Sequence, residues 1–245
     1  MAKRRALIVG GGSKFGKIIA LGLLEEGYEV DIITSTGPPH KDIQYSKVNW
    51  ERLNHFLSIK ALAKFKSGEP YNVIIFSQNA GSQGTPEQYG NMTINEHAAW
   101  SQEFFTNVQF VDIVINELRD RIISTTKVIA LASGIIQNSV TVVDSKESIL
   151  AEKYAGYAGM KCFLYYMMQG YSKFKTGNFI TVNPGHMNNE EQYDYFSKGF
   201  LEFIKVVKDK ELEYGMYTSY TVLSGNLAYS KIAFKNEFGP KIRNK

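Results

Sequence analysis

A short apolar segment followed by a cluster of glycines constrains the fold of this chain more than any other feature. Leu7 to Val9 is typical of a buried parallel strand, and the turn from Gly10 to Gly16 follows it directly. Apolar residues then recur at the spacing of one helix face, at Ile18, Ile19, Leu21, Leu23 and Leu24. A strand, a glycine turn and a helix N-terminus present backbone N–H groups and the positive end of a helix dipole, which suits a pyrophosphate.

Two glycines of this turn have distinct expected roles. Gly10 lets the chain turn sharply off the strand, and Gly16 lets the helix pack close to the sheet. A glycine cluster is a weak signal alone, because ordinary strand-to-helix turns also use glycine for steric reasons. The predicted pyrophosphate-binding residues are Gly10, Gly12, Ser13, Lys14, Phe15 and Gly16.

Length and composition predict one globular domain spanning residues 1–245. Hydrophobic residues make up 44% and charged residues 21% of the 245 residues, and no apolar run approaches the ~20 residues of a membrane helix. The apolar segment after Lys3, Arg4 and Arg5 is too short for a secretory signal. We therefore expect a cytoplasmic protein without a membrane partner.

The remaining composition argues against several other classes. Cys162 is the single cysteine, and the four histidines have no metal-ligand spacing, so neither an internal disulfide nor a metal site is expected. The net charge of +4 is mild and scattered. The basic C-terminal residues Lys241, Arg243 and Lys245 are more typical of a solvated terminus than of a nucleic-acid-binding arm, so no nucleic-acid partner is expected.

Apolar segments of strand length alternate with amphipathic helical patterns along the chain. After the first strand, further strands are predicted at 29–34, 43–48, 73–76, 127–132 and 178–182, and helices from about Trp50 to Phe65 and at 97–121, 154–174 and 192–208. Such alternation predicts an α/β fold with a doubly wound parallel sheet and helices on both faces.

Five short motifs occur in order along residues 6–190. They are Gly10 to Gly16, Asn79-Ala80-Gly81, Asn107, Ser133 with Tyr157 and Lys161, and Asn183-Pro184-Gly185. Together they resemble the classical short-chain dehydrogenase/reductase family. The resemblance implies a Rossmann-type domain that interconverts a carbonyl and an alcohol by hydride transfer to or from a nicotinamide cofactor.

The pair Tyr157 and Lys161 supports this function on physical grounds. Residues four apart share one face of a helix, so the Lys161 ammonium can lie near the Tyr157 phenol. A nearby positive charge favours the phenolate and makes Tyr157 a usable general acid or base. The resemblance implies that Lys161 also holds the nicotinamide ribose, and that Asn107 keeps a water beside Lys161 for proton relay.

A serine is expected to orient and polarise the substrate oxygen. Ser133 follows a predicted strand end but lies 24 residues before Tyr157, about twice the usual family spacing. Ser145, twelve residues before Tyr157, fits that spacing but not the strand end. We prefer Ser133 and interpret 135–152 as an insertion, a candidate lid on a substrate side that also includes 186–208.

Cofactor preference depends on the end of the second predicted strand. Thr34 and Ser35 stand where an acidic residue would bind the ribose hydroxyls of NAD(H), and Lys14 could meet a 2′-phosphate, so NADP(H) is preferred and NAD(H) stays possible. Asn49 could hydrogen-bond adenine. The resemblance adds contacts from Asn79, Ala80, Gly81, Pro184, Gly185 and Met187.

One departure from the family pattern leaves a second function open. The usual middle glycine of the turn is replaced by Lys14 or, in the alternative spacing, by Ser13. A catalytically weak dinucleotide-binding regulator or scaffold of the same fold is therefore the alternative. The large side chains of helices 97–121 and 154–174 favour pairing with another subunit, and the resemblance implies a homodimer or homotetramer.

Overall fold

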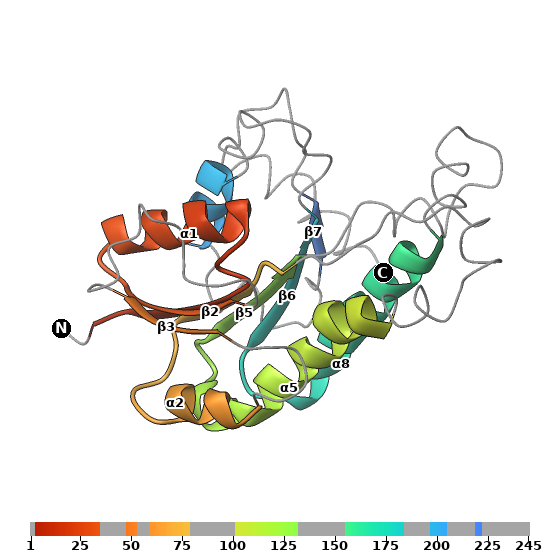
Figure 1. Ribbon diagram of the computed structural model, residues 1–245, viewed down its shortest axis with the longest axis horizontal. Helices are drawn as coiled ribbons and strands as arrows, with labels where there is room; N and C mark the ends of the chain where they lie inside the picture. Colours follow the sequence, from red (N-terminus) through yellow and green to blue (C-terminus); the bar gives the residue numbers. More distant parts are fainter. Residues whose placement is uncertain are drawn as a thin grey trace, which may run out of the picture.

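Short apolar segments pair side by side into one parallel sheet of seven strands (Figure 1). The computed structural model describes residues 3–34, 48–52, 59–78, 101–131, 155–183, 197–204 and 219–221. The strands are β1 Arg5–Val9, β2 Glu29–Thr34, β3 Val48–Arg52, β4 Val73–Phe76, β5 Lys127–Leu131, β6 Asn178–Asn183 and β7 Ser219–Thr221. Their order is β3-β2-β1-β4-β5-β6-β7, and every ladder is parallel.

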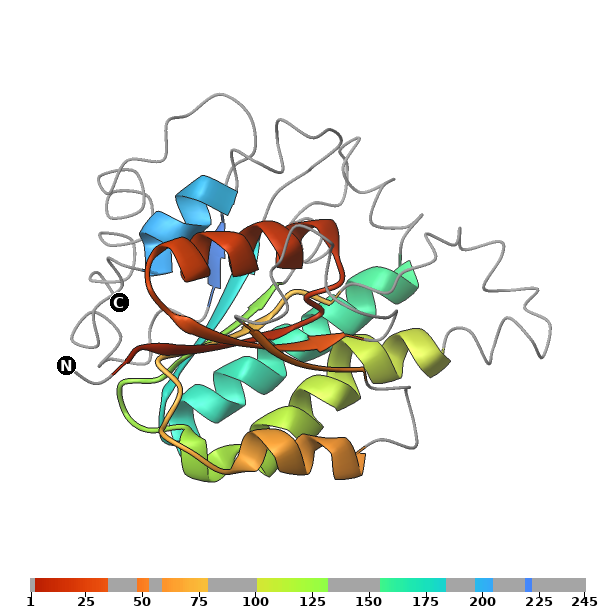
Figure 2. The same ribbon diagram turned by 60° about the vertical axis from the view of Figure 1, so that its left-hand side comes forward.

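Helices cover both faces of this sheet, as Figures 1 and 2 show. One face carries α1, Lys14–Glu25, and the helical residues 197–204. The other carries α2, Ala63–Lys66, α5, Phe110–Glu117, and α8, Ala155–Phe174. Short 3-10 turns precede α2 at Ile59–Leu62 and follow α5 at Arg119–Arg121. The predicted Rossmann-type doubly wound fold is confirmed.

The strands alternate their side chains between two cores, one on each face. Ala6 and Ile8 join Ile19 and Phe200 in one buried cluster, while Leu7 and Val9 join α5 and α8 in the other. Both faces of β1 are buried, which is why its sequence is continuously apolar. None of the helices in the described ranges combines the length and the hydropathy that crossing a bilayer requires.

The third strand corrects the sequence prediction. Residues 43–47, predicted as part of a strand, lie outside the described residues, and β3 runs from Val48 to Arg52. Trp50, predicted to begin a helix, pairs with Ile32 as a strand residue and packs against the core. The apolar spacing from Trp50 onward matched a helix face, but parallel pairing with β2 decides the conformation here.

The helix predicted at 97–121 is interrupted. Residues 101–104 are helical, Phe105–Gln109 form a π-helical segment, and α5 ends at Glu117. Thr106 Oγ1 donates to the Gln102 carbonyl at 2.9 Å, and Asn107 Nδ2 donates to the Glu103 carbonyl at 2.9 Å. Side chains that bond back to a carbonyl of the preceding turn compete with the backbone ladder, so this Thr-Asn pair accounts for a widened turn.

A buried polar network ties the β2 side of the sheet to the α2 and α5 layer. The Tyr71 hydroxyl donates to Asp31 Oδ2 at 2.6 Å and accepts from Arg121 Nη1 at 2.8 Å. Arg5 Nη2 lies 3.2 Å from the same Asp31 oxygen. Burial is the largest cause that raises the pKa of Tyr71, so this hydroxyl keeps its proton and bridges the two charged groups.

Removing the Tyr71 hydroxyl tests this network. We expect Tyr71→Phe to lower the free energy of unfolding by about 1–3 kcal/mol, because the buried Asp31 carboxylate loses a donor and Arg121 loses an acceptor. Tyr28→Phe, a partly buried tyrosine that packs against the other core, should change it by less than about 0.5 kcal/mol. Urea unfolding of both variants measures the difference, and equal effects would contradict the network.

Candidate functional site

The glycine turn lies at the point where the strand order reverses. The chain leaves β1, passes through α1 to β2 on one side, and later places β4 on the other side of β1. In open parallel sheets this crevice at the carboxyl ends of the strands is where ligands bind. The turn therefore occupies the position expected of a dinucleotide-binding loop.

The two steric roles predicted for the glycines are confirmed. Gly10 has a φ of 91°, and a Cβ there would lie 2.5 Å from the Gln78 backbone nitrogen. A Cβ on Gly16 would lie 2.5 Å from the Gly10 carbonyl oxygen and 2.8 Å from Gly11 Cα. Both positions are closed to any larger residue because backbone atoms are the neighbours.

Ser13 and Lys14 have different roles in the turn. Ser13 is the N-cap of α1, and its hydroxyl accepts the Gly16 N–H at 3.0 Å. Lys14 is exposed at the first helical position, and Phe15 is buried against Phe200. The first turn of α1 holds no acidic residue, so Lys14 adds positive charge to the helix N-terminus. Gly12 is exposed beside it.

The end of β2 carries no carboxylate. Thr34 is its last residue and is buried, whereas Asp31 lies three positions earlier within the Tyr71 network. Asn49 pairs with Asp31, so it lies inside the sheet rather than level with Thr34. Arg52 is the residue that pairs with Thr34, and it is exposed. Sequence reasoning missed Arg52 because the strand was predicted to end at Val48.

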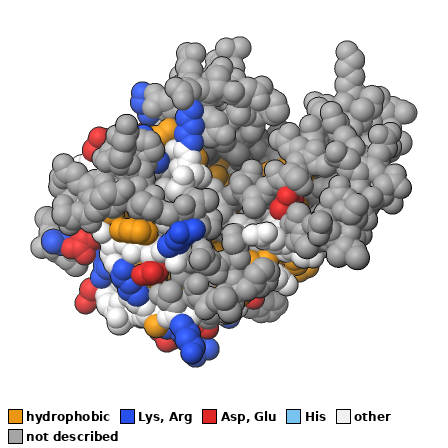
Figure 3. All heavy atoms as spheres, in the orientation of Figure 1, with side chains coloured by type: hydrophobic (Ala, Val, Ile, Leu, Met, Phe, Trp, Pro, Cys, Tyr) orange, Lys and Arg blue, Asp and Glu red, His pale blue; other side chains and the backbone are white. Residues whose placement is uncertain are grey.

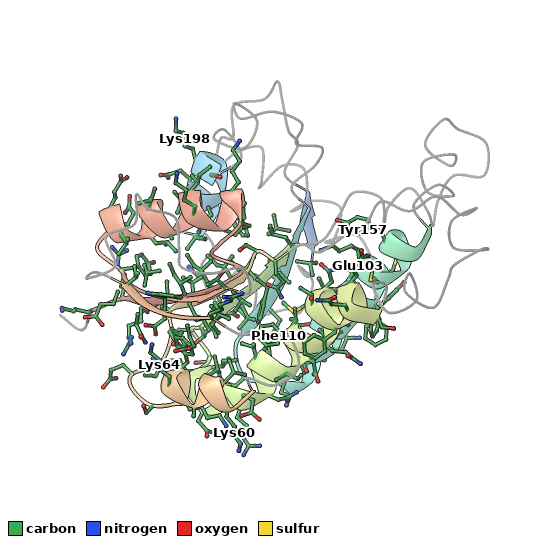
Figure 4. All side chains as sticks on the ribbon, in the orientation of Figure 1. Lys60, Lys64, Glu103, Phe110, Tyr157 and Lys198 are labelled. Atoms are coloured by element: carbon green, nitrogen blue, oxygen red, sulfur yellow. The ribbon has the colours of Figure 1, made fainter. Side chains whose placement is uncertain are left out.

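Three of the predicted catalytic residues come together between α8 and the π segment. The Lys161 Nζ is 3.5 Å from Asn107 Oδ1 and donates to the Leu131 carbonyl at 3.1 Å. It also lies 5.6 Å from the centre of the Tyr157 ring. Leu131 is the last residue of β5, so the group stands at the carboxyl end of that strand. Figure 4 shows Tyr157 on α8 near Glu103, which precedes the π segment.

Burial controls the electrostatics of this group. Lys161 is 1% exposed and Asn107 is 1% exposed, whereas Tyr157 is only partly buried. Desolvation lowers the pKa of Lys161 from 10.5 to about 8. The ammonium therefore remains mostly charged at neutral pH but can release and regain its proton at a pH close to neutral. Because Asn107 Nδ2 is engaged by the Glu103 carbonyl, its Oδ1 is directed to Lys161.

Several predicted site residues lie outside the described residues. They are Ser133, its alternative Ser145, and the predicted cofactor contacts Ser35, Asn79, Ala80, Gly81, Pro184, Gly185 and Met187. The region 135–152 and most of 186–208 lie outside as well. The contact between Lys161 and Leu131 does bring the chain two residues before Ser133 to the Tyr157 and Lys161 pair.

On the face drawn in Figure 3, the Lys and Arg side chains of the described residues do not form a basic stripe. There, Lys and Arg side chains of the described residues are interspersed with Asp and Glu side chains. Within the same described ranges, no group of three or more His, Cys, Asp and Glu side chains is arranged to hold a metal ion.

Comparison with solved structures identifies the fold. A carbonyl reductase from Pseudomonas aeruginosa PAO1 in complex with NADP superposes with a TM-score of 0.66 at 17% identity, over 90% of this chain and 96% of that chain. A short-chain dehydrogenase/reductase from Serratia marcescens gives 0.61 at 15% identity, over 89% and 95%. A structure with bound NADP from Burkholderia multivorans, described as a short-chain dehydrogenase/reductase, gives 0.67 at 17% identity, over 90% and 96%.

These similarities show that the chain has the short-chain dehydrogenase/reductase fold. Sequence comparison gave no match, either to a model of a known protein family or to a curated protein.

The buried Lys161 predicts an alkaline rise in stability. Between pH 8 and pH 10.5 the unfolded chain binds the lysine proton while the folded chain releases it, so the free energy of unfolding rises with pH. Relative to Lys161→Met, the wild type should gain on the order of 3 kcal/mol across this window. Urea unfolding of the ligand-free proteins at several pH values measures the gain, and a constant difference would contradict the lowered pKa.

Proposed function

We propose that the chain is a short-chain dehydrogenase/reductase that interconverts a carbonyl and an alcohol with NADP(H). The observation that carries the proposal is the group formed by Tyr157, Lys161 and Asn107 at the carboxyl end of β5. In an open parallel sheet this edge is where ligands bind, and the glycine turn follows β1 at the same edge. The bound structures from Pseudomonas aeruginosa and Burkholderia multivorans support NADP as the cofactor.

The residues of the turn fit a dinucleotide. The N-terminus of the twelve-residue helix α1 faces the switch point of the sheet without any acidic residue in its first turn. Exposed Gly12 and Lys14 offer backbone and ammonium donors to a diphosphate, and Gly10 and Gly16 keep side chains away. When bound, the dinucleotide would supply a hydride to the carbonyl carbon of the substrate, or accept one from the carbinol carbon of the alcohol.

The chain's own residues handle the proton. In the reductive direction Tyr157 donates its phenolic proton to the substrate oxygen as the alcohol forms, which leaves a phenolate. The Lys161 ammonium, close to the ring, stabilises that phenolate, and Asn107 holds the ammonium in place. The Lys161 ammonium then passes a proton to the phenolate, and the resulting amine regains a proton from solvent by way of the water that Asn107 is proposed to keep beside it. In the oxidative direction each transfer is reversed.

Substrate recognition is assigned to the part of the chain that follows β5 and β6. We propose Ser133 as the residue that polarises the substrate oxygen, because it follows the strand end that contacts Lys161. Ser145 is the alternative, and residues 135–152 form the proposed lid. The substrate class is a small-molecule carbonyl or its alcohol.

The end of β2 favours NADP(H) over NAD(H). Thr34 carries no charge that would repel a 2′-phosphate, and Arg52 stands level with it on the neighbouring strand. A guanidinium presents several donors to a phosphate, so Arg52 and Lys14 are the proposed partners of that group.

A homo-oligomer remains part of the proposal. Phe163 is 54% exposed and Tyr166 is 63% exposed on α8, and Phe163 packs edge to face against Phe104. Large exposed aromatic side chains on a helix are typical of surfaces that meet a partner. A homodimer or homotetramer that buries this face of α8 stays a prediction.

A catalytically weak regulator of the same fold is the alternative function. The observation that favours it is the Ser13 cap. The Gly16 N–H donates its hydrogen bond to the Ser13 hydroxyl, so this N–H is not offered to a phosphate oxygen. Measuring turnover distinguishes the two functions, because only the oxidoreductase requires the Tyr157 hydroxyl.

Tyr157→Phe tests the acid/base role. We expect turnover to fall by roughly 10²- to 10⁴-fold, because the phenyl ring cannot transfer a proton, while the dissociation constant for NADPH changes little. Tyr166→Phe, an exposed tyrosine of the same helix, is the matched control and should keep full activity. Absorbance of the reduced nicotinamide measures turnover, and unchanged activity of Tyr157→Phe would exclude the mechanism.

Arg52→Ala tests the cofactor preference. We expect NADPH binding to weaken by roughly 10- to 100-fold, the loss of a hydrogen bond to a charged group, with NADH binding within about twofold of the wild type. Arg119→Ala, which removes an exposed arginine after α5, is the control and should change neither. Fluorescence titration with each cofactor gives the constants. Equal weakening for NADPH and NADH would contradict a contact with the 2′-phosphate.

A further inference from the structure

Gln78 connects the glycine turn to the π segment that carries Asn107. It lies two residues beyond the end of β4, and its backbone nitrogen is the atom that a Cβ on Gly10 would meet at 2.5 Å. The preceding residue, Ser77, is fixed to the end of β1 because its N–H and hydroxyl both donate to the Val9 carbonyl, at 2.8 and 3.0 Å. The backbone of Gln78 is therefore held against the turn.

The side chain of Gln78 reaches in the other direction. Its Nε2 donates to the Thr106 carbonyl oxygen at 3.3 Å. Within the π segment the Phe110 N–H donates to the Phe105 carbonyl, five residues back, and α5 begins at Phe110. Where a helix changes from i→i−5 back to i→i−4 hydrogen bonds, one carbonyl oxygen receives no backbone N–H from within the helix. The carbonyl next after Phe105 is that of Thr106, and Gln78 supplies its donor.

In the part of the chain that the structure describes, the same side-chain amide that makes this contact also leaves its oxygen, Gln78 Oε1, without a hydrogen bond. Among the described residues Gln78 Oε1 is one of the few buried side-chain polar atoms without a hydrogen-bond partner. Leaving a buried acceptor unsatisfied destabilises the folded chain, and an apolar side chain of similar length would avoid that penalty. The donor function of Nε2 gives a physical reason for an amide at this position.

We propose that Gln78 is a positioning residue for the proton-transfer group, an inference that rests on the proposed function. By satisfying the Thr106 carbonyl, Gln78 holds the π segment open at the residue before Asn107. This fixes the direction of Asn107 Oδ1 toward the Lys161 Nζ, 3.5 Å away. Gln78 acts through Asn107 and Lys161 rather than on substrate.

The test compares Gln78→Met with a matched control. Methionine keeps the length of the side chain and removes the donor, while Gln109→Met removes an exposed amide from the same π segment. In Gln78→Met we expect kcat to fall roughly 10- to 100-fold with little change in KM, because the proton-transfer group is misplaced while binding is intact. Backbone amides of residues 105–111 should exchange with solvent roughly fivefold faster, as expected for one lost hydrogen bond. Gln109→Met should match the wild type in both.

The outcomes separate the inference from the function on which it rests. Wild-type kcat and exchange rates in Gln78→Met would overturn the inference while leaving the oxidoreductase intact. Faster exchange with an unchanged kcat, or a rise confined to KM, would also overturn it. A wild type that neither binds NADPH nor turns over carbonyls would overturn the proposed function, and faster exchange in Gln78→Met would then still support the link between Gln78 and the π segment.

Discussion

The candidate site depends on an ammonium group buried between a strand end and a helix. Lys161 is almost fully buried, and in the part of the chain that the structure describes its ammonium contacts the Leu131 carbonyl and the Asn107 amide oxygen. Burying a charged group beside neutral dipoles costs desolvation free energy, and this cost lowers the pKa of Lys161. Within the described residues no carboxylate contributes to the pKa of Lys161, and under the proposed mechanism its ammonium stabilises a phenolate on Tyr157.

The fold supplies the two surfaces between which this group is held. Parallel pairing of β4, β5 and β6 fixes the end of β5, and α8 packs across β6 on the same face as α5. The glycine turn follows β1 on the far side of β4, where Gly10 permits close approach of the Gln78 backbone. The glycine turn and the group of Tyr157, Lys161 and Asn107 thus stand at the carboxyl ends of β1 and β5, two strands of one sheet that are separated only by β4.

The sequence predicted those parts whose signals are local and strong. The apolar strands at β1, β2, β4 and β5, the helical spacing of α8, and the pair of Tyr157 and Lys161 four residues apart were all visible in the pattern. It failed at β3, where Trp50 fits a helix face but pairs with Ile32, and so it missed Arg52 beside Thr34. The π segment was also missed, because the apolar spacing matched one continuous helix and the bonds from Thr106 and Asn107 back to the preceding turn leave no periodic signal.

Isotope transfer is the measurement that tests the central claim most directly. The wild-type protein is incubated with NADPH deuterated at the transferable position and a mixture of aldehydes and ketones, and the alcohols are analysed by mass spectrometry. The account predicts deuterium on the carbinol carbon of at least one alcohol, and incorporation that is roughly 10²- to 10⁴-fold slower with Tyr157→Phe. Bound NADPH with no deuterium in any product would contradict it and favour the regulator of the same fold.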